Sequence, residues 1–185
     1  GERLNTHARK VACQTCHIPE YARGPLPTKM SWDWSTAGRT NENGERLKVR
    51  GSAGRIIYDS NKGDFSYDHY VIPEYVWFDG NIEYTLFGDK INPDEVVKIN
   101  HFLGDPNDPK ARIWPIKRFT GKQPIDKKLG TLAVFHTAGD DENAFWGKGH
   151  YDWDKALKVG MASVGAEYSG EMAFVKTEMS WPITH

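Results

Sequence analysis

The stretch Cys13-Gln14-Thr15-Cys16-His17 decides how the rest of this chain is interpreted. It holds the only two cysteines in 185 residues, separated by two residues and followed directly by a histidine. This pattern is typical of the attachment site of a c-type haem, in which two thiols form thioethers with the haem and the histidine is an axial ligand of the iron. The sequence therefore predicts one covalently bound haem c on Cys13 and Cys16, with His17 as proximal ligand.

Two other chemistries use closely spaced cysteines. A thioredoxin-like dithiol lies between a strand and a helix of a βαβ unit, whereas here Ile18-Pro19 interrupts any helix just after the motif. A structural zinc site needs four ligands, and the histidines after the motif are scattered singly along the chain. Haem is the preferred interpretation, with zinc or a disulfide as the alternatives.

Composition excludes some partners and indicates a location. The 24 basic and 25 acidic residues leave a formal net charge of −1 without a block of like charge, so we expect no nucleic-acid partner. The sequence has no apolar run of the length that spans a bilayer and no signal-peptide pattern, and it begins with glycine, so we interpret it as a mature or excised piece. Because haem attachment to this motif normally follows export, we expect a periplasmic or extracytoplasmic location.

Aromatic residues are abundant, with seven Trp, eight Tyr and eight Phe, although the mean hydropathy is only −0.65. A core poor in aliphatic runs must rely on these rings, each of which buries roughly 150–250 Å². Trp32 and Trp34 lie two apart and face the same side of an extended segment. Packing in an aromatic core is the preferred interpretation of each tryptophan, and lining one edge of the haem pocket is the alternative for this pair.

The pattern of the chain predicts a single domain over residues 1–185, of the α+β class with much irregular structure. A multihaem cytochrome c-like domain with short antiparallel strands and a few short helices is expected. Residues 79–81 predict a hairpin turn, residues 112–116 an edge strand limited by its proline, and residues 153–162 the best helix. The expected short strands lie at residues 47–49, 55–58, 71–72, 75–78 and 82–87.

The sixth iron ligand decides the function, because an iron without one has an open position for substrate. His136 is the first choice, since it ends the apolar run 129–136 and is therefore expected to be buried. His185 and His7 come next, and Met30 is a weaker alternative because methionine more often fills gaps in a core. Ligation by two histidines predicts a low-potential electron carrier.

Six phrases are far more specific than a bare C-x-x-C-H motif. They are VACQTCHIPEYAR at 11–23, WDWSTAG at 32–38, VIPEYVWF at 71–78, RIWP at 112–115, GKQP at 121–124 and EMSWPITH at 178–185. In these phrases the chain resembles the octahaem tetrathionate reductase family of multihaem cytochromes c. The likeness covers nearly the whole chain and is placed in the carboxy-terminal half of such proteins.

Members of that family carry eight haem motifs, seven with bis-histidine irons and one active-site haem with a lysine distal ligand. Since this chain has one motif, the resemblance implies a fragment with one haem site at Cys13, Cys16 and His17. It also implies that His7 and His185 ligate haems attached elsewhere, and that the redox partners are other haem-bearing segments of the parent protein. The resemblance implies that the parent protein reduces tetrathionate, nitrite or hydroxylamine. It does not imply this activity for the present chain alone.

Three functions compete at this point. The first is electron transfer through a six-coordinate haem. The second is a catalytic five-coordinate haem that reduces a small oxyanion, which the basic residues Lys29, Arg23 and Arg39 would attract. The third is a structural or zinc-binding domain without haem.

Overall fold

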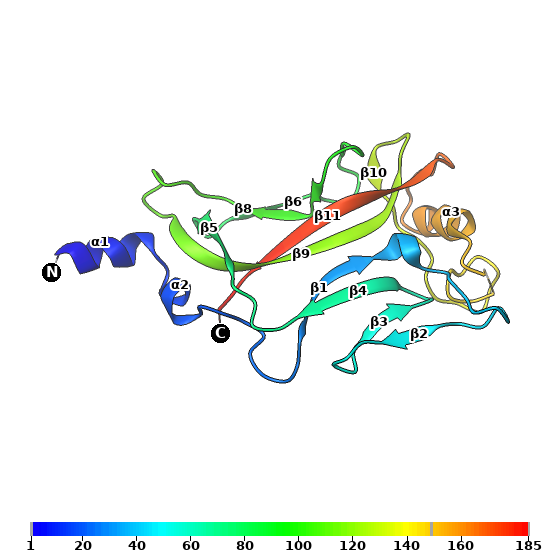
Figure 1. Cartoon of the computed structure of the whole chain (residues 1–185). Coiled ribbons are helices and arrows are strands. Elements are labelled where there is room, and N and C mark those ends of the chain that lie inside the picture. Colours follow the sequence, from blue (N-terminus) through cyan, green and yellow to red (C-terminus); the bar gives the residue numbers. More distant parts are fainter. Residues whose placement is uncertain (1, 149, 185) are drawn as a thin grey trace.

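Two long neighbouring strands run through the centre of the fold. The computed structural model describes residues 2–148 and 150–184. Strands β9 (Arg112–Asp126) and β11 (Met172–Pro182) are antiparallel and pair without interruption, from Met172 opposite Asp126 to Pro182 opposite Ile116. Figure 1 shows them as the long twisted ribbons on which the other elements are arranged.

The remaining elements are short. The helices are α1 (Glu2–Lys10), α2 (Cys13–His17), the 3-10 helix η1 (Trp34–Thr36) and α3 (Trp153–Ser163). The other strands are β1 (Thr28–Asp33), β2 (Lys48–Arg50), β3 (Ile56–Asp59), β4 (Gly63–Asp68), β5 (Glu74–Phe78), β6 (Ile82–Tyr84), β7 (Val97–Lys98), β8 (Asn100–Phe102) and β10 (Thr131–Leu132). The expected α+β class with short strands and few helices is confirmed, with β9 and β11 as longer strands than expected.

The main sheet has the strand order β2-β3-β4-β1-β9-β11-β7, with β5 and β10 also paired to β9. The pairs β1 with β9 and β7 with β11 are parallel, and the other pairs in this sheet are antiparallel. A separate two-stranded sheet joins β6 to β8. Because β5 and β1 both lie along one edge of β9, while β11 covers the other, β9 organises the whole sheet.

Three expectations about the strands are wrong. The segment 71–72 forms only an isolated bridge, between Val71 and Tyr21. The segment at 112–116 is the beginning of the central strand β9, not an edge strand. The prolines are tolerated because neighbouring ladders begin or end beside them: Pro115 precedes the first residue paired with β11, and Pro124 lies between the parts paired with β1 and β10. Residues 79–81 do not form a hairpin, because β5 pairs with β9 and β6 pairs with β8.

An aromatic core fills the space between the sheet and α3. Trp32 and Trp34 stack with their ring centroids 4.6 Å apart, so they do face the same side. Trp34 also contacts Phe135 and Trp153, and Trp153 packs 4.1 Å from the ring of Phe145. The predicted reliance on rings holds at this end of the molecule, whereas a second buried cluster, of Val97, Ile125 and Val175, is aliphatic. The pair belongs to the α3 end of the molecule, which is opposite the α2 end (Figure 1).

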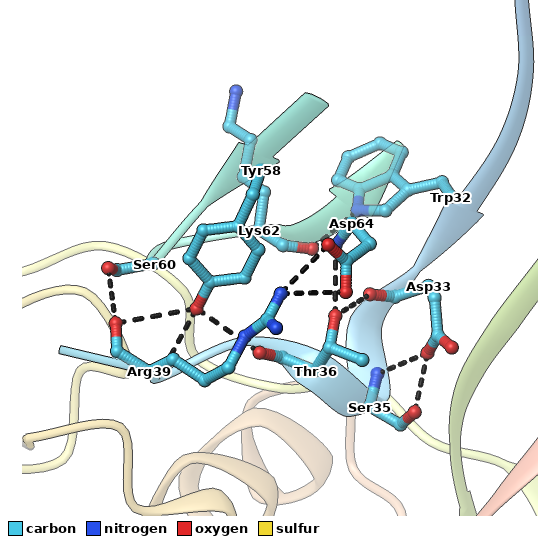
Figure 2. A network of polar contacts seen from close by, with 9 residues as sticks. All are labelled: Trp32, Asp33, Ser35, Thr36, Arg39, Tyr58, Ser60, Lys62 and Asp64. Atoms are coloured by element: carbon cyan, nitrogen blue, oxygen red, sulfur yellow. Dashed lines mark hydrogen bonds and ion pairs between the residues drawn. The ribbon is translucent and has the colours of Figure 1, made fainter. Parts of the chain in front are cut away.

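A polar network holds the end of β1 against the hairpin of β3 and β4 (Figure 2). Arg39 donates hydrogen bonds of 2.8 Å to both carboxylate oxygens of Asp64 and lies 3.9 Å above the ring of the buried Tyr58. The hydroxyl of Thr36 donates to the Asp33 carbonyl at 3.1 Å. These contacts stabilise the turn after β1 and involve none of the predicted haem ligands.

Candidate haem attachment site

The motif folds as the short helix α2, from Cys13 to His17. Side chains three and four positions apart share one face of a helix, so both cysteines and the histidine lie side by side. Both thiols are free and exposed, and the imidazole of His17 is exposed as well. The helix ends where the sequence predicts, at Ile18, whose N–H donates to the Gln14 carbonyl at 2.8 Å before Pro19.

The helix is attached to the sheet through one residue of β9. The Thr15 hydroxyl donates to the Ile113 carbonyl at 2.7 Å, and the N–H of the buried Ala12 donates to the same oxygen at 3.0 Å. Val11 forms a parallel β-bridge with Ile113. The two residues before α2 and its own Thr15 therefore hold the cysteine-bearing helix in a defined place.

This place lies just beyond the end of β11. The strand ends at Pro182, and the N–H of Ile183 donates to the Pro115 carbonyl at 2.9 Å, two residues from the anchor of α2. The motif and the last described residues of the chain consequently occupy the same end of the sheet (Figure 1). His185, which the resemblance assigns to another iron, lies outside the described residues.

His136 is not brought beside the motif. Its N–H donates to the Ala156 carbonyl in α3 at 2.9 Å, and its Nε2 lies 2.9 Å from a carboxylate oxygen of Asp141. The hydrogen bond from His136 lowers the pKa of Asp141, and a main-chain hydrogen bond from Asn143 acts in the same direction. The side chain is partly buried, in line with its apolar run, but α3 and α2 lie at opposite ends of the molecule (Figure 1). The choice of His136 as sixth ligand stays a prediction that this geometry does not support.

The other candidate ligands lie closer to the motif in the chain. His7 is exposed in the last turn of α1, and its carbonyl accepts a hydrogen bond of 2.9 Å from Val11. The sulfur of Met30 lies 3.8 Å from the hydroxyl of Tyr21, which donates to it. Burial raises the pKa of that hydroxyl, and the nearby carboxylates of Glu74 and Asp68 raise it further.

The basic residues proposed to attract an oxyanion are engaged within the chain. Arg39 is paired with Asp64, and Arg23 lies 4.0 Å from Glu20. The ammonium of Lys29 lies 3.7 Å above the ring of Phe65, and burial and then the charge of Lys62 lower the pKa of Lys29. The structure therefore does not assemble these three residues into an anion site.

The donor set fits a covalently attached haem. Two free thiols and one imidazole on a single exposed face match two thioethers and one axial ligand. A structural zinc site needs a fourth ligand, and in residues 2–148 and 150–184 no group of three or more His, Cys, Asp or Glu side chains is arranged to hold a metal ion.

The anchor of the motif is a feature that sequence reasoning missed. Thr15 stands at a variable position of C-x-x-C-H, and its partner Ile113 is 98 residues away in the chain. The phrase RIWP marked the region of Ile113 without indicating its role. A long-range hydrogen bond of this kind leaves no periodic pattern in a single sequence.

None of the described helices combines the length and the apolar character that crossing a bilayer requires.

Comparison with known proteins gives the family. A model of the family described as "Cytochrome c bacterial" matches residues 29–185. The solved structure of the octahaem cytochrome c from Shewanella oneidensis is 41% identical, with a TM-score of 0.87. The match covers 100% of this chain and 42% of that protein, so the chain spans less than half of its length. Among curated proteins, no sequence matches significantly. The resemblance expected from the six phrases is thus confirmed, and the chain belongs to the bacterial cytochrome c family, with its likeness to multihaem cytochromes of the octahaem family.

Proposed function

We propose that this chain carries one haem c on Cys13 and Cys16 and transfers single electrons between that haem and neighbouring haems of a longer oxidoreductase. The observation that carries the proposal is the arrangement of α2, where two free thiols and the His17 imidazole share one exposed face. The family supports a redox role based on haem. Multihaem cytochromes use such sites as relays in which each iron accepts and passes one electron.

The residues of the chain have separate tasks in this proposal. The thiols of Cys13 and Cys16 would hold the haem covalently, and the His17 imidazole would ligate its iron. The haem, when bound, supplies the one-electron chemistry. Thr15 and Ala12 hold α2 against Ile113, so that the attachment point keeps its distance and orientation relative to the rest of the protein. A fixed position matters because the protein's contribution to such chemistry is binding and orientation.

The partners are proposed to be other haem-bearing segments of the same protein, because the related structure is an octahaem cytochrome of which this chain matches 42%. The sequence resemblance leads us to propose reduction of tetrathionate, nitrite or hydroxylamine by the whole protein, in the periplasm or another extracytoplasmic compartment. The sixth ligand of this iron is proposed to be a histidine. His7 and His185 are the preferred candidates, and His136 is the least favoured because it is bonded to α3.

Mass spectrometry tests the covalent link. The full chain is produced in an exporting bacterium that has a cytochrome c maturation system, alongside Cys13→Ser, Cys16→Ser and the double variant. We expect the mass of one haem on the unchanged chain and no covalent haem on the double variant. Gln14→Ala keeps both thiols and serves as the control, which should still carry the haem. An unmodified mass of the unchanged chain contradicts the proposal.

Absorption spectroscopy separates electron transfer from catalysis at this iron. A six-coordinate low-spin spectrum that is unaffected by cyanide or nitrite supports electron transfer. A high-spin spectrum that shifts when either anion is added contradicts it and supports the five-coordinate alternative.

A further inference from the structure

The segment that follows the motif is joined to the segment before β5. Tyr21 and Val71 exchange two main-chain hydrogen bonds, of 2.9 and 3.0 Å, and the N–H of Tyr70 donates to the Ala22 carbonyl at 3.3 Å. The ring nitrogen Nδ1 of His69 lies 3.2 Å from the Gly24 carbonyl. Residues 21–26 and 69–72 thus form one unit, which we name the loop pair (Figure 1 shows it between α2, β4 and β5).

The loop pair contains two residues in a conformation that disfavours side chains. Ala22 has a φ of 56° and Tyr70 a φ of 49°, in the left-handed region that glycine adopts readily. A residue other than glycine is strained there and persists only where its surroundings hold it. In Tyr70 this strained backbone carries a large aromatic side chain.

Three of the exposed side chains of the loop pair are large and apolar, and they stand beside the charged Arg23. Tyr70 is 57% exposed, Ile72 is 71% exposed and Leu26 is 66% exposed. A single exposed apolar side chain needs no explanation, but three on one small unit make that unit a candidate for contact with another group. The ring of Tyr70 lies 6.3 Å from the ring of His69, yet more than half of the residue stays exposed.

The loop pair begins close to the haem attachment site. Tyr21 is four residues after His17, and a chain of that length spans at most about 14 Å. The aromatic pair that the sequence suggested for lining the haem, Trp32 and Trp34, packs against Phe135 and α3 at the other end of the molecule. The loop pair is therefore the exposed apolar surface that directly follows the motif in the chain.

We propose that Tyr70, Ile72 and Leu26 line the haem attached to Cys13 and Cys16 and exclude water from it. This inference rests on the proposed function, because it requires the haem to be present. Aromatic and aliphatic side chains suit the flat apolar surface of a porphyrin. An apolar shell around a redox centre controls solvent access and therefore its reduction potential, since water stabilises the more highly charged ferric state.

Substitution of Tyr70 by glycine tests the contact between its ring and the haem without disturbing the fold. Glycine accepts the left-handed conformation, so Tyr70→Gly removes the ring without adding backbone strain, and the thermal stability should not fall. Tyr70→Phe keeps the ring, and Ile72→Ser tests a second position. Tyr84→Ser in β6 is the matched control, since Tyr84 is 58% exposed and lies on the separate two-stranded sheet.

The measurements are the reduction potential and the circular dichroism of the haem Soret band, on the full haem-bearing chain. We expect Tyr70→Gly and Ile72→Ser to lower the potential and change the Soret dichroism. Tyr70→Phe and Tyr84→Ser should match the unchanged chain. If Tyr70→Gly and Ile72→Ser leave both signals unchanged, or if Tyr84→Ser changes them equally, the inference is wrong. The proposed function fails by a different result, namely the absence of covalent haem from the unchanged chain.

Discussion

The hydroxyl of Thr15 donates a hydrogen bond of 2.7 Å to the main-chain carbonyl of Ile113, which lies 98 residues further along the chain. This contact joins the haem attachment helix to the central strand of the sheet. The same carbonyl accepts the N–H of Ala12, so α2 is held on both sides of Cys13. The cysteine pair is local in sequence, but its position in the molecule depends on β9.

Thr15→Val removes the hydroxyl while keeping the shape of the side chain. Because the Ile113 carbonyl keeps its bond from Ala12, we expect a loss of about 1 kcal/mol in the free energy of unfolding, measured by chemical denaturation. Thr6→Val is the matched control, since the Thr6 hydroxyl donates to the Glu2 carbonyl on the exposed helix α1. The control should change stability by less than about 0.5 kcal/mol. Equal losses would show that the Thr15 contact does not stabilise the sheet.

Gly63→Ala should be strongly destabilising. Gly63 has a φ of 88°, and a Cβ added there lies 2.0 Å from the Asp33 carbonyl oxygen, so the turn after β1 has to move. Backbone strain and displacement of the turn together are expected to lower the free energy of unfolding by about 3 kcal/mol or more. Gly54→Ala has a similar φ of 70° with nothing within 4 Å, and should cost only about 1 kcal/mol. Thermal unfolding of both variants measures the difference, and a smaller loss for Gly63→Ala contradicts the observed packing.

Asp126 makes stability depend on pH in the acid range. Burial raises the pKa of this carboxylate, but hydrogen bonds from Ser169 and Leu129 outweigh it, so the folded pKa lies below the usual value. A lowered folded pKa contributes stability above the unfolded pKa, and that stability is lost as pH falls through the folded pKa. We expect Asp126→Asn to lower the free energy of unfolding by about 2 kcal/mol at pH 7. This difference between the variant and the unchanged chain, here called the gap, should narrow below about pH 4.

Denaturation of this variant at several pH values measures the gap. Asp94→Asn, at an exposed position, is the control and should follow the unchanged chain at every pH. A gap that is constant down to about pH 2 would mean that the carboxylate charge does not contribute.

His17→Ala and His136→Ala should give different spectra. His17 lies beside Cys16 on α2, so its loss should remove the proximal ligand and change the spin state of the iron. His136 is bonded to α3 at the other end of the molecule, so its loss should leave the spin state unchanged (Figure 1). Absorption spectroscopy of the haem-bearing full chain decides the question. A high-spin spectrum for His136→Ala would restore His136 as the sixth ligand.

Local patterns allowed several elements to be predicted. The helix at 153–162 is α3, and the short strands near residues 48, 56, 76 and 83 are present. These elements depend on the periodicity of neighbouring residues, which a sequence displays directly. The segment 71–72 forms only an isolated bridge between Val71 and Tyr21.

Long-range pairing was the part that sequence patterns missed. The prolines of β9 resemble strand breakers, and their tolerance depends on where β11, β1 and β10 begin and end beside them. The turn at 79–81 resembles a hairpin, but β5 and β6 each find a different partner. Such choices depend on competition among strands that are distant in the chain.

The sequence by itself determined the donor set of the candidate site. Two thiols and an imidazole within five consecutive residues predict a haem attachment site, because one helical turn places them on one face without help from the rest of the chain. Only the tertiary structure decided where that face is held, through Ile113, and which candidate ligands lie near it. Trp32, Trp34 and His136 lie at the α3 end, and residues 69–72 pair with the segment that follows the motif. The reason is physical: helix geometry is set by neighbours in sequence, whereas sheet pairing is set by neighbours in space.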